Sequence, residues 1–373
     1  MSTTETASLP LSQAGPASPE TTHSARGRLA QVEDDKAMLR AARELTRDIS
    51  EARAAIYWPD MIGSALIGYA ALAGAILLAN PWAALASALV AVLALYRALL
   101  FIHEISHIHR DALPGFRLGW NLMVGIPMLT PSLMYENVHT LHHARTRYGT
   151  VQDPEYLPLA LMKPWTLPVF ALTALLLPVA LLVRSALLVP LGALLPPIRK
   201  LVWERASALA INPAFRRRPA EGAFRRQVAW QEAAASVWAW ALIGSVFLIG
   251  WRPLVIALAI VSVVALLNQV RTLVAHLWEN EGDAMTVTAQ FMDSVNVPPP
   301  GRIAELWAPV GLRYHATHHL LPSMPYHSLG EAHRRLTAEL GDGSTYAGSS
   351  HKGLAPLMKR LASGTMRARE RSD

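Results

Sequence analysis

The fold is decided by residues 61–102, which read MIGSALIGYAALAGAILLANPWAALASALVAVLALYRALLFI. Two apolar runs, 61–79 and 82–102, are separated only by Asn80 and Pro81. Each run has about the 20 residues that an α-helix needs to cross a bilayer. The pair therefore predicts a transmembrane helical hairpin.

The second half of the chain repeats this pattern, because residues 230–250 and 253–277 form another apolar pair. Of the 373 residues, 52% are hydrophobic and only 16% are charged, which is typical of a membrane protein. The chain has no cysteine, which excludes disulfides, thiolate metal sites and a cysteine nucleophile. The net charge is +7, and its basic residues lie beside the apolar runs. This placement indicates that they set the membrane topology rather than bind nucleic acid.

A fifth apolar region, 165–197, is interrupted by Pro168, Pro178, Pro190 and Arg184. The loop after it, 199–226, carries eight Lys or Arg against two Glu, which predicts a cytoplasmic location. A re-entrant or interfacial hairpin over 165–197 would return this loop to the face where the second span ends. We therefore expect an all-α integral membrane protein with two transmembrane hairpins, this apolar hairpin and a cytoplasmic helical cap.

Three parts of the chain are distinguished by composition. Residues 1–53 begin with a Ser-, Thr-, Ala- and Pro-rich stretch, expected to be disordered, and end in a charged surface helix. Residues 54–345 should form the membrane domain, and 346–373 a basic tail. No short apolar stretch of a secretory signal precedes the first span, and we assign no chemistry to either end.

Most of the chain's fourteen histidines fall into three boxes: HEISH at 103–107, HTLHH at 139–143 and HATHH at 315–319. In a helix, residues three and four apart leave the same face, so each box should present its rings together. The predicted spans place all three boxes on one membrane face, and His276 near the end of the fourth span joins them. This cap-borne cluster is a candidate metal site.

Other interpretations of the boxes remain open. HExxH alone indicates a zinc metalloprotease with Glu104 as the base, although that leaves the other two boxes unexplained. A non-catalytic, histidine-lined metal carrier is a further alternative. Zinc is satisfied by four ligands, whereas imidazole also suits iron, and nine rings suffice for two metals with open positions for oxygen. The pattern favours a histidine-rich di-iron site.

The boxes HxxxH, HxxHH and HxxHH, with hairpins around them, resemble the membrane fatty acid desaturase family. The stretches HHARTRYGTVQDPE (142–155) and HHLLPSMPYHSL (318–329) are similar to that family's sequences, and the resemblance covers about residues 55–340. It implies an enzyme with two non-haem irons and O₂ as co-substrate that desaturates a lipid- or thioester-linked acyl chain. A related hydroxylase or acetylenase is the alternative, because rebound of oxygen would give an alcohol.

The resemblance also implies the ligands and the groups around them. The metal ligands would be His103, His107, His139, His142, His143, His315, His318 and His319, with His276 as the ninth. Independently of the resemblance, each ring needs a partner on its second nitrogen. The side chains near enough in sequence are Glu104, Glu136, Asn137, Asp153 and Glu155, unless these are solvated surface groups. His109, on another helix face, is left out, as are His23, His327, His333 and His351. The family's Asn one turn before the ninth histidine is replaced by Thr272, with Asn268 a turn earlier, so the outer shell there should differ.

Electrons must come from a separate ferredoxin-like or cytochrome donor, because the chain lacks a His-Pro-Gly-Gly haem motif. The basic loop 199–226 would suit an acidic donor, although positive-inside topology explains the same charge. The remaining expected partners are an acyl-chain substrate and membrane lipid, with no nucleic acid. We expect a bacterial inner-membrane protein whose active site faces the cytoplasm.

Overall fold

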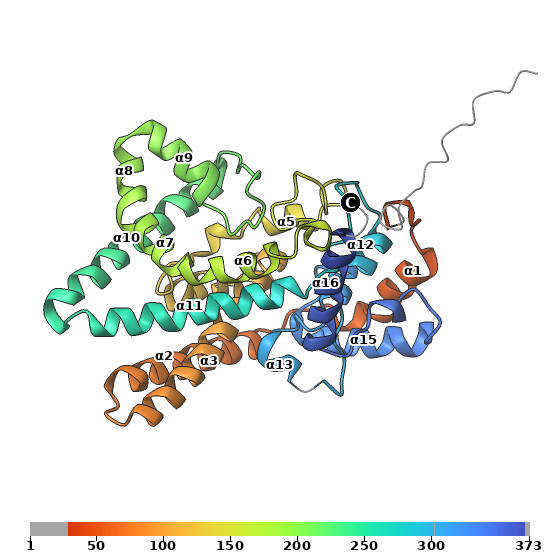
Figure 1. The fold of residues 1–373 in the computed structure, drawn as a ribbon, viewed down its shortest axis with the longest axis horizontal. Helices are drawn as coiled ribbons and strands as arrows, with labels where there is room; N and C mark the ends of the chain where they lie inside the picture. Colours follow the sequence, from red (N-terminus) through yellow and green to blue (C-terminus); the bar gives the residue numbers. More distant parts are fainter. Residues whose placement is uncertain (1–28, 302, 370–373) are drawn as a thin grey trace, which may run out of the picture.

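The computed structural model describes residues 29–301 and 303–369, and every regular element in them is helical (Figure 1). The longest helices are α2 (Ala54–Leu77), α3 (Pro81–His107), α10 (Gly222–Ile249) and α11 (Arg252–Leu273). α2 packs along α3, and α10 turns back into α11 at Gly250 and Trp251. Both turns lie at the same end of the molecule (Figure 1).

One of these helices is shorter than its predicted span. The apolar run 253–277 predicts a helix that includes His276, but α11 ends at Leu273. Beyond it the backbone of residues 275–277 pairs with residues 293–295: Leu277 N–H donates to the Asp293 carbonyl at 2.7 Å. His276 is therefore presented by an extended segment, because a second chain segment supplies the hydrogen bonds that a helix would have made internally.

The hairpin predicted inside 165–197 is wrong in its position. α6 (Thr166–Thr173), α7 (Leu177–Val183) and α8 (Val189–Leu194) form one continuous helical run, and the chain reverses only at residues 195–196. The turns before Pro178 and Pro190 are wound as a 3₁₀ turn and a π turn, which lets the helix pass the prolines. The returning arm is α9 (Pro196–Ala206), which packs on α8.

The segment after α9 lies against the part of the chain that carries the second histidine box. Leu209 N–H donates to the Met134 carbonyl and Ile211 N–H to the Pro154 carbonyl, each at 2.9 Å. Arg217 is buried and donates to the carbonyl of Glu136. The basic loop and the histidine box thus occupy the same region of the molecule. Their side of the membrane stays a prediction.

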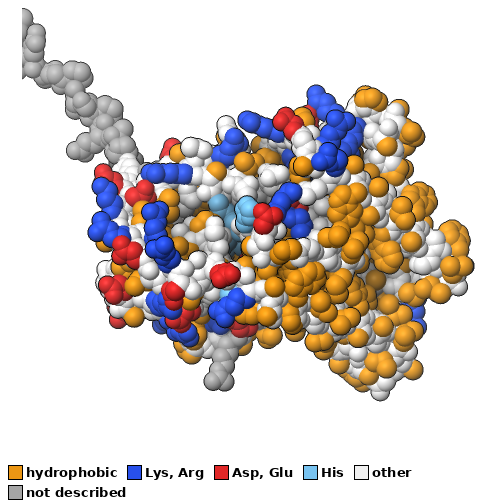
Figure 2. Space-filling model, turned by 180° about the vertical axis from the view of Figure 1, so that it is seen from behind, with side chains coloured by type: hydrophobic (Ala, Val, Ile, Leu, Met, Phe, Trp, Pro, Cys, Tyr) orange, Lys and Arg blue, Asp and Glu red, His pale blue; other side chains and the backbone are white. Residues whose placement is uncertain are grey.

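The surface divides into an apolar and a charged half. Hydrophobic side chains cover one half in Figure 2, and Lys, Arg, Asp and Glu gather on the other. Large apolar side chains stand exposed near the helical turns, among them Trp82 at 78% and Phe247 at 88%. Five helical runs, including 166–194, are long and apolar enough to cross a membrane. An apolar surface this extensive is typical of a membrane protein.

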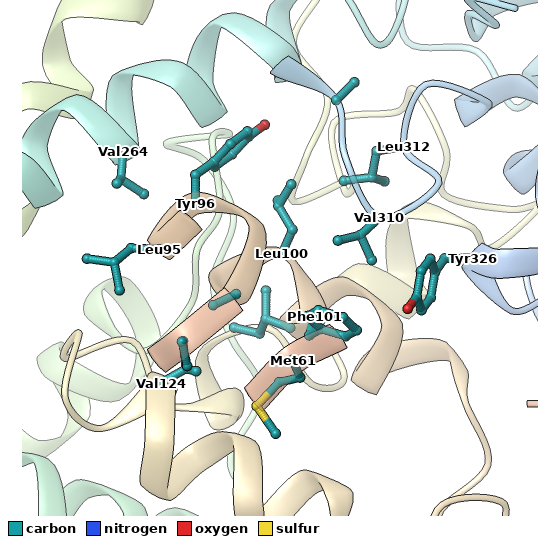
Figure 3. Close-up of a cluster of buried hydrophobic side chains, with 14 of the residues drawn as sticks. Met61, Leu95, Tyr96, Leu100, Phe101, Val124, Val264, Val310, Leu312 and Tyr326 are labelled. Atoms are coloured by element: carbon teal, nitrogen blue, oxygen red, sulfur yellow. The ribbon is translucent and has the colours of Figure 1, made fainter. Parts of the chain in front are cut away.

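The core joins the long helices to the cap (Figure 3). Met61 of α2, Phe101 of α3 and Val264 of α11 are buried together with Val310 and Leu312 from the cap. The cap contains α5 (His139–His142), α12 (Val287–Asp293), α13 (Ala304–Trp307), α14 (His315–Leu320) and α15 (Tyr326–Leu340). The short helix α4 (Phe116–Trp120) instead packs on α3, where Trp120 Nε1 donates to the Ala98 carbonyl at 2.9 Å. This shared core fixes the ends of the long helices against the short helices that carry the histidines.

Both ends of the described chain pack on the cap. α1 (Lys36–Leu45) contacts α15, burying Met38 and Ala42. The segment predicted as a basic tail, 346–373, contains the helix α16 (Leu354–Arg369), whose Leu357 and Leu361 are buried. Basic residues between these leucines hid the helical spacing of its apolar face. The disordered stretch predicted at the N-terminus falls mainly on residues 1–28, which lie outside the described residues, as do 370–373.

Candidate metal centre

The nine candidate histidines converge in one cluster. His103 and His107 come from the last turns of α3, the second box lies on α5 and its C-cap, and the third box lies on α14. The long helix ends and short cap helices meet here, and seven of the nine rings are buried. A hollow on the charged part of the surface exposes histidine side chains in Figure 2.

The rings form two groups, and within each the ring nitrogens lie within 4.8 Å of one another. The five-ring group contains His103, His107, His139, His143 and His318, and the four-ring group contains His142, His276, His315 and His319. Each HxxHH box contributes its first and last rings to one group and its middle ring to the other. This follows from helix geometry. Seen down the helix axis, residue i+4 is rotated by only about 40° from residue i, whereas residue i+3 is rotated in the other direction.

The ring spacing fits a bound metal. The Nε2 atoms of His139 and His143 are 3.0 Å apart, and those of His276 are 3.1 Å from His315 and 3.2 Å from His142. Nitrogen ligands at right angles around a metal, with bonds of about 2.1 Å, would stand about 3.0 Å apart. Burial lowers the pKa of His315 and His319 well below its usual range, which keeps these rings in the neutral form that binds metals.

Two of the predicted carboxylates orient rings of the second box. Asp153 lies 2.9 Å from His142 Nδ1, and Glu155 lies 2.8 Å from His139 Nδ1. The Asp153 carboxylate is itself fixed by the backbone N–H groups of Gly149 and Glu155, each at 2.8 Å. Such contacts on the outer nitrogen set the tautomer and direct Nε2 toward the centre of the group.

The other predicted partners form no hydrogen bond to a ring, although Glu104 Oε1 lies 3.6 Å from His103 Nδ1. Glu136 bonds Ser132 and pairs with Arg117. No described hydrogen bond joins the Asn137 side chain to a ring. The expectation that every ring has an outer partner also fails in part. The buried Nδ1 atom has no hydrogen-bond partner among the described residues in five rings: His103, His143, His315, His318 and His319.

The structure adds an orienting pair that the sequence did not reveal. The Tyr148 hydroxyl lies 2.8 Å from His276 Nδ1 and donates to Asp293 Oδ2 at 2.9 Å. Burial raises the pKa of Asp293 to about 7. Ser294 Oγ is also 3.2 Å from His276 Nδ1. Tyr148 lies within the family-like stretch after the second box, whereas nothing in the sequence near Asp293 indicated this role.

The excluded histidines remain outside both groups. His109 is on the surface, with 80% of its side chain exposed, and His333 bonds the Tyr346 hydroxyl at 3.0 Å. Glu104, the base of the metalloprotease interpretation, is buried and accepts hydrogen bonds from the Tyr57 hydroxyl at 2.5 Å and from Tyr326 N–H at 3.0 Å. These contacts hold Glu104 as a structural anchor, which weakens the protease interpretation.

Fold and site together define a helical membrane protein with two adjoining histidine groups, each of which could hold a metal ion. The family model described as fatty acid desaturase matches residues 79–349. A ceramide hydroxylase of Caulobacter vibrioides (strain NA1000 / CB15N) is 48% identical over 328 residues, which are 87% of this chain and 93% of that protein. No solved structure matches the chain significantly. The chain belongs to the fatty acid desaturase family, which confirms the resemblance and makes it an oxidoreductase.

Proposed function

We propose that this protein is an O₂-dependent di-iron hydroxylase of a ceramide or a closely related membrane lipid. The observation that carries the proposal is the 48% identity, over 87% of this chain, with a ceramide hydroxylase. Desaturation of an acyl chain, the leading expectation from the sequence, becomes the second candidate. It uses the same histidine boxes, but the named relative favours insertion of oxygen.

The proposed metal ligands are the nine clustered histidines. Two irons held there would activate O₂, with one oxygen atom entering a C–H bond and the other leaving as water. The protein's part is to keep the rings neutral and aimed. His142 and His139 are oriented by Asp153 and Glu155, and His276 is oriented by Tyr148. With Nε2 facing the metal, the Nδ1 hydrogen of His276 would be donated to the Tyr148 oxygen.

Hydroxylation and desaturation share their electron balance, since each consumes one O₂, two electrons and two protons. Hydroxylation returns one water and an alcohol, whereas desaturation returns two waters and an alkene. The electrons would come from an external ferredoxin-like or cytochrome donor. Arg218, Arg225 and Arg226 are exposed in the basic loop and at the start of α10, where an acidic donor would be attracted. We place this face in the cytoplasm, at a bacterial inner membrane.

Lipid analysis of a host that makes ceramides tests the proposal. Expression of the full chain should yield ceramides one oxygen atom heavier, and a His142→Ala variant expressed at the same level should not. Ceramides or acyl chains two hydrogen atoms lighter, without a hydroxylated product, would support desaturation instead. If a host expresses the folded, iron-loaded protein and its ceramides remain unchanged, the proposed substrate is wrong.

A further inference from the structure

The C-terminal helix α16, to which the sequence assigned no chemistry, closes a small cavity beside the metal centre. α16 packs on the turn of residues 159–161 and lies next to the cap end of α11 (Figure 1). The enclosed volume between these elements is about 20 Å³. Its wall is mostly apolar and is formed by Leu273 and Leu277 together with Leu357, Leu361 and Gly364 of α16.

His276 joins this cavity to the four-ring group. It forms part of the cavity wall, and its Nε2 atom lies 3.1 Å from His315 and 3.2 Å from His142. Every ring of the four-ring group is buried, whereas His107 and His143 of the five-ring group are partly exposed. The cavity is therefore separated from the buried group by a single residue.

The side chains that line the cavity offer a bound molecule no free polar atom. Both ring nitrogens of His276 are engaged, Nε2 by neighbouring rings and Nδ1 by the Tyr148 hydroxyl at 2.8 Å. The charged lining residues, Glu279 and Arg360, approach each other to 3.4 Å and have side chains that are 39% and 49% exposed, so they lie at the surface end of the cavity. A buried water needs about two to four polar partners. The cavity therefore suits an apolar molecule.

The size of the cavity narrows the choice of ligand. One water-sized molecule needs roughly 10–15 Å³, so a volume of about 20 Å³ holds one small molecule and no acyl chain. O₂ is small and apolar, and the proposed reaction consumes it. Leu273 ends the apolar helix α11, so the cavity also lies where the apolar half of the protein meets the cap. Because O₂ dissolves more readily in hydrocarbon than in water, this position favours its entry.

We propose that this cavity binds O₂ next to the four-ring group and that α16 forms the wall that holds it there. The inference rests on the proposed hydroxylase function and deepens it, because O₂ and the lipid then reach the metal centre by separate routes. The close approach of α16 to the 159–161 turn makes the cavity easy to fill. A Cβ atom on Gly364 would lie 3.9 Å from the Ala160 carbonyl oxygen and 4.0 Å from Ala160 Cβ, which are ordinary contacts.

Xenon tests the cavity without any turnover, because it is apolar and occupies cavities lined by aliphatic side chains. Crystals of the full-length protein kept under xenon pressure should show an anomalous scatterer between α16 and the end of α11. Gly364→Leu should abolish this signal, because the added side chain would occupy the cavity. Ala355→Leu, on the exposed face of the same helix, is the matched control and should retain it. Wild-type crystals without xenon in the cavity would overturn the inference.

Oxygen kinetics provide the readout that a merely structural role would not move. With iron-loaded protein and saturating ceramide, Gly364→Leu should raise KM for O₂ about tenfold, with KM for the ceramide and kcat at saturating O₂ unchanged. Ala160→Val narrows the cavity from the other element and should act in the same direction. Iron content should equal that of the wild type in both variants and in Ala355→Leu. The inference is wrong if KM for O₂ stays within about twofold of the wild-type value in both filled variants.

The two proposals fail in different ways. If the wild type hydroxylates no ceramide, the proposed function is wrong, but the cavity is still tested. Xenon binding needs no lipid, and neither does stopped-flow mixing of dithionite-reduced, iron-loaded protein with O₂, in which iron is oxidised and O₂ is reduced. Slower oxidation of Gly364→Leu than of Ala355→Leu would support the O₂ site, and equal rates would refute it.

Discussion

Removal of His276 tests whether the two histidine groups act as two separate metal sites. His276→Ala takes one ring from the four-ring group and leaves the five-ring group complete. Three imidazoles from His142, His315 and His319 are too few to retain an ion through purification, so we expect the iron content to fall from about two to about one per chain. The substitution also leaves the buried hydroxyls of Tyr148 and Ser294 without their ring partner, at a cost of about 1–3 kcal/mol of stability.

Metal analysis of full-length protein purified from iron-supplemented cells measures this outcome, with lipid hydroxylation assayed in parallel. His142→Ala should behave in the same way, because that ring belongs to the same group. His109→Ala is the matched control: its ring is exposed on the surface, so both irons and full activity should remain. Two irons and near-normal turnover in His276→Ala would refute the assignment of a ninth ligand, and one tightly held zinc in the wild type would revive the metalloprotease.

Three further substitutions or fusions follow from specific contacts. Tyr148→Phe keeps the ring but removes the hydroxyl between His276 and Asp293. In a chelator competition, the affinity of the four-ring group for iron should therefore fall about 10–100-fold. The control is His333→Phe, which is remote from both groups and should leave this affinity unchanged. Glu232→Gln leaves Arg184 and Arg199 without their shared carboxylate and should cost about 3–5 kcal/mol of stability in thermal unfolding, unlike Glu204→Gln, whose partner Lys200 is exposed. Reporters fused after Arg226 and after His319 should report the same side of the membrane, because the loop before Arg226 is hydrogen-bonded to the segment that carries the second histidine box. If the two reporters lie on opposite sides, residues 166–194 cross the membrane fully.

Sequence spacing predicted much of the candidate site. The boxes placed eight rings correctly within one cluster, and the position of His276 beside them followed from the family resemblance and the direction of its span. Helix period also explained why His109 stands apart. Asp153 and Glu155 were near enough along the chain to be recognised as partners. Their function as ligands and orienting groups stays a prediction, although the geometry fits it.

The errors arose where a local pattern was overridden by contacts. Four apolar spans were found because hydrophobic length is a property of the local sequence, but the end of α11 depended on pairing with residues 293–295. Proline positions predicted a break within 165–197, whereas local 3₁₀ and π turns let the helix continue. The basic residues of the C-terminal segment masked the apolar face that α16 buries.

The sequence by itself determined the helical membrane class, the family and the side chains that are candidates for binding metal, because hydrophobic period and box spacing are encoded over a few turns. Only the tertiary structure decided how the rings divide into two groups and which residues hold them. The contact of Tyr148 with Asp293 joins positions 145 residues apart, and the approach of His142 to His276 joins positions 134 residues apart. Such contacts depend on how the helices pack in three dimensions, and no periodic pattern in the local sequence predicts them.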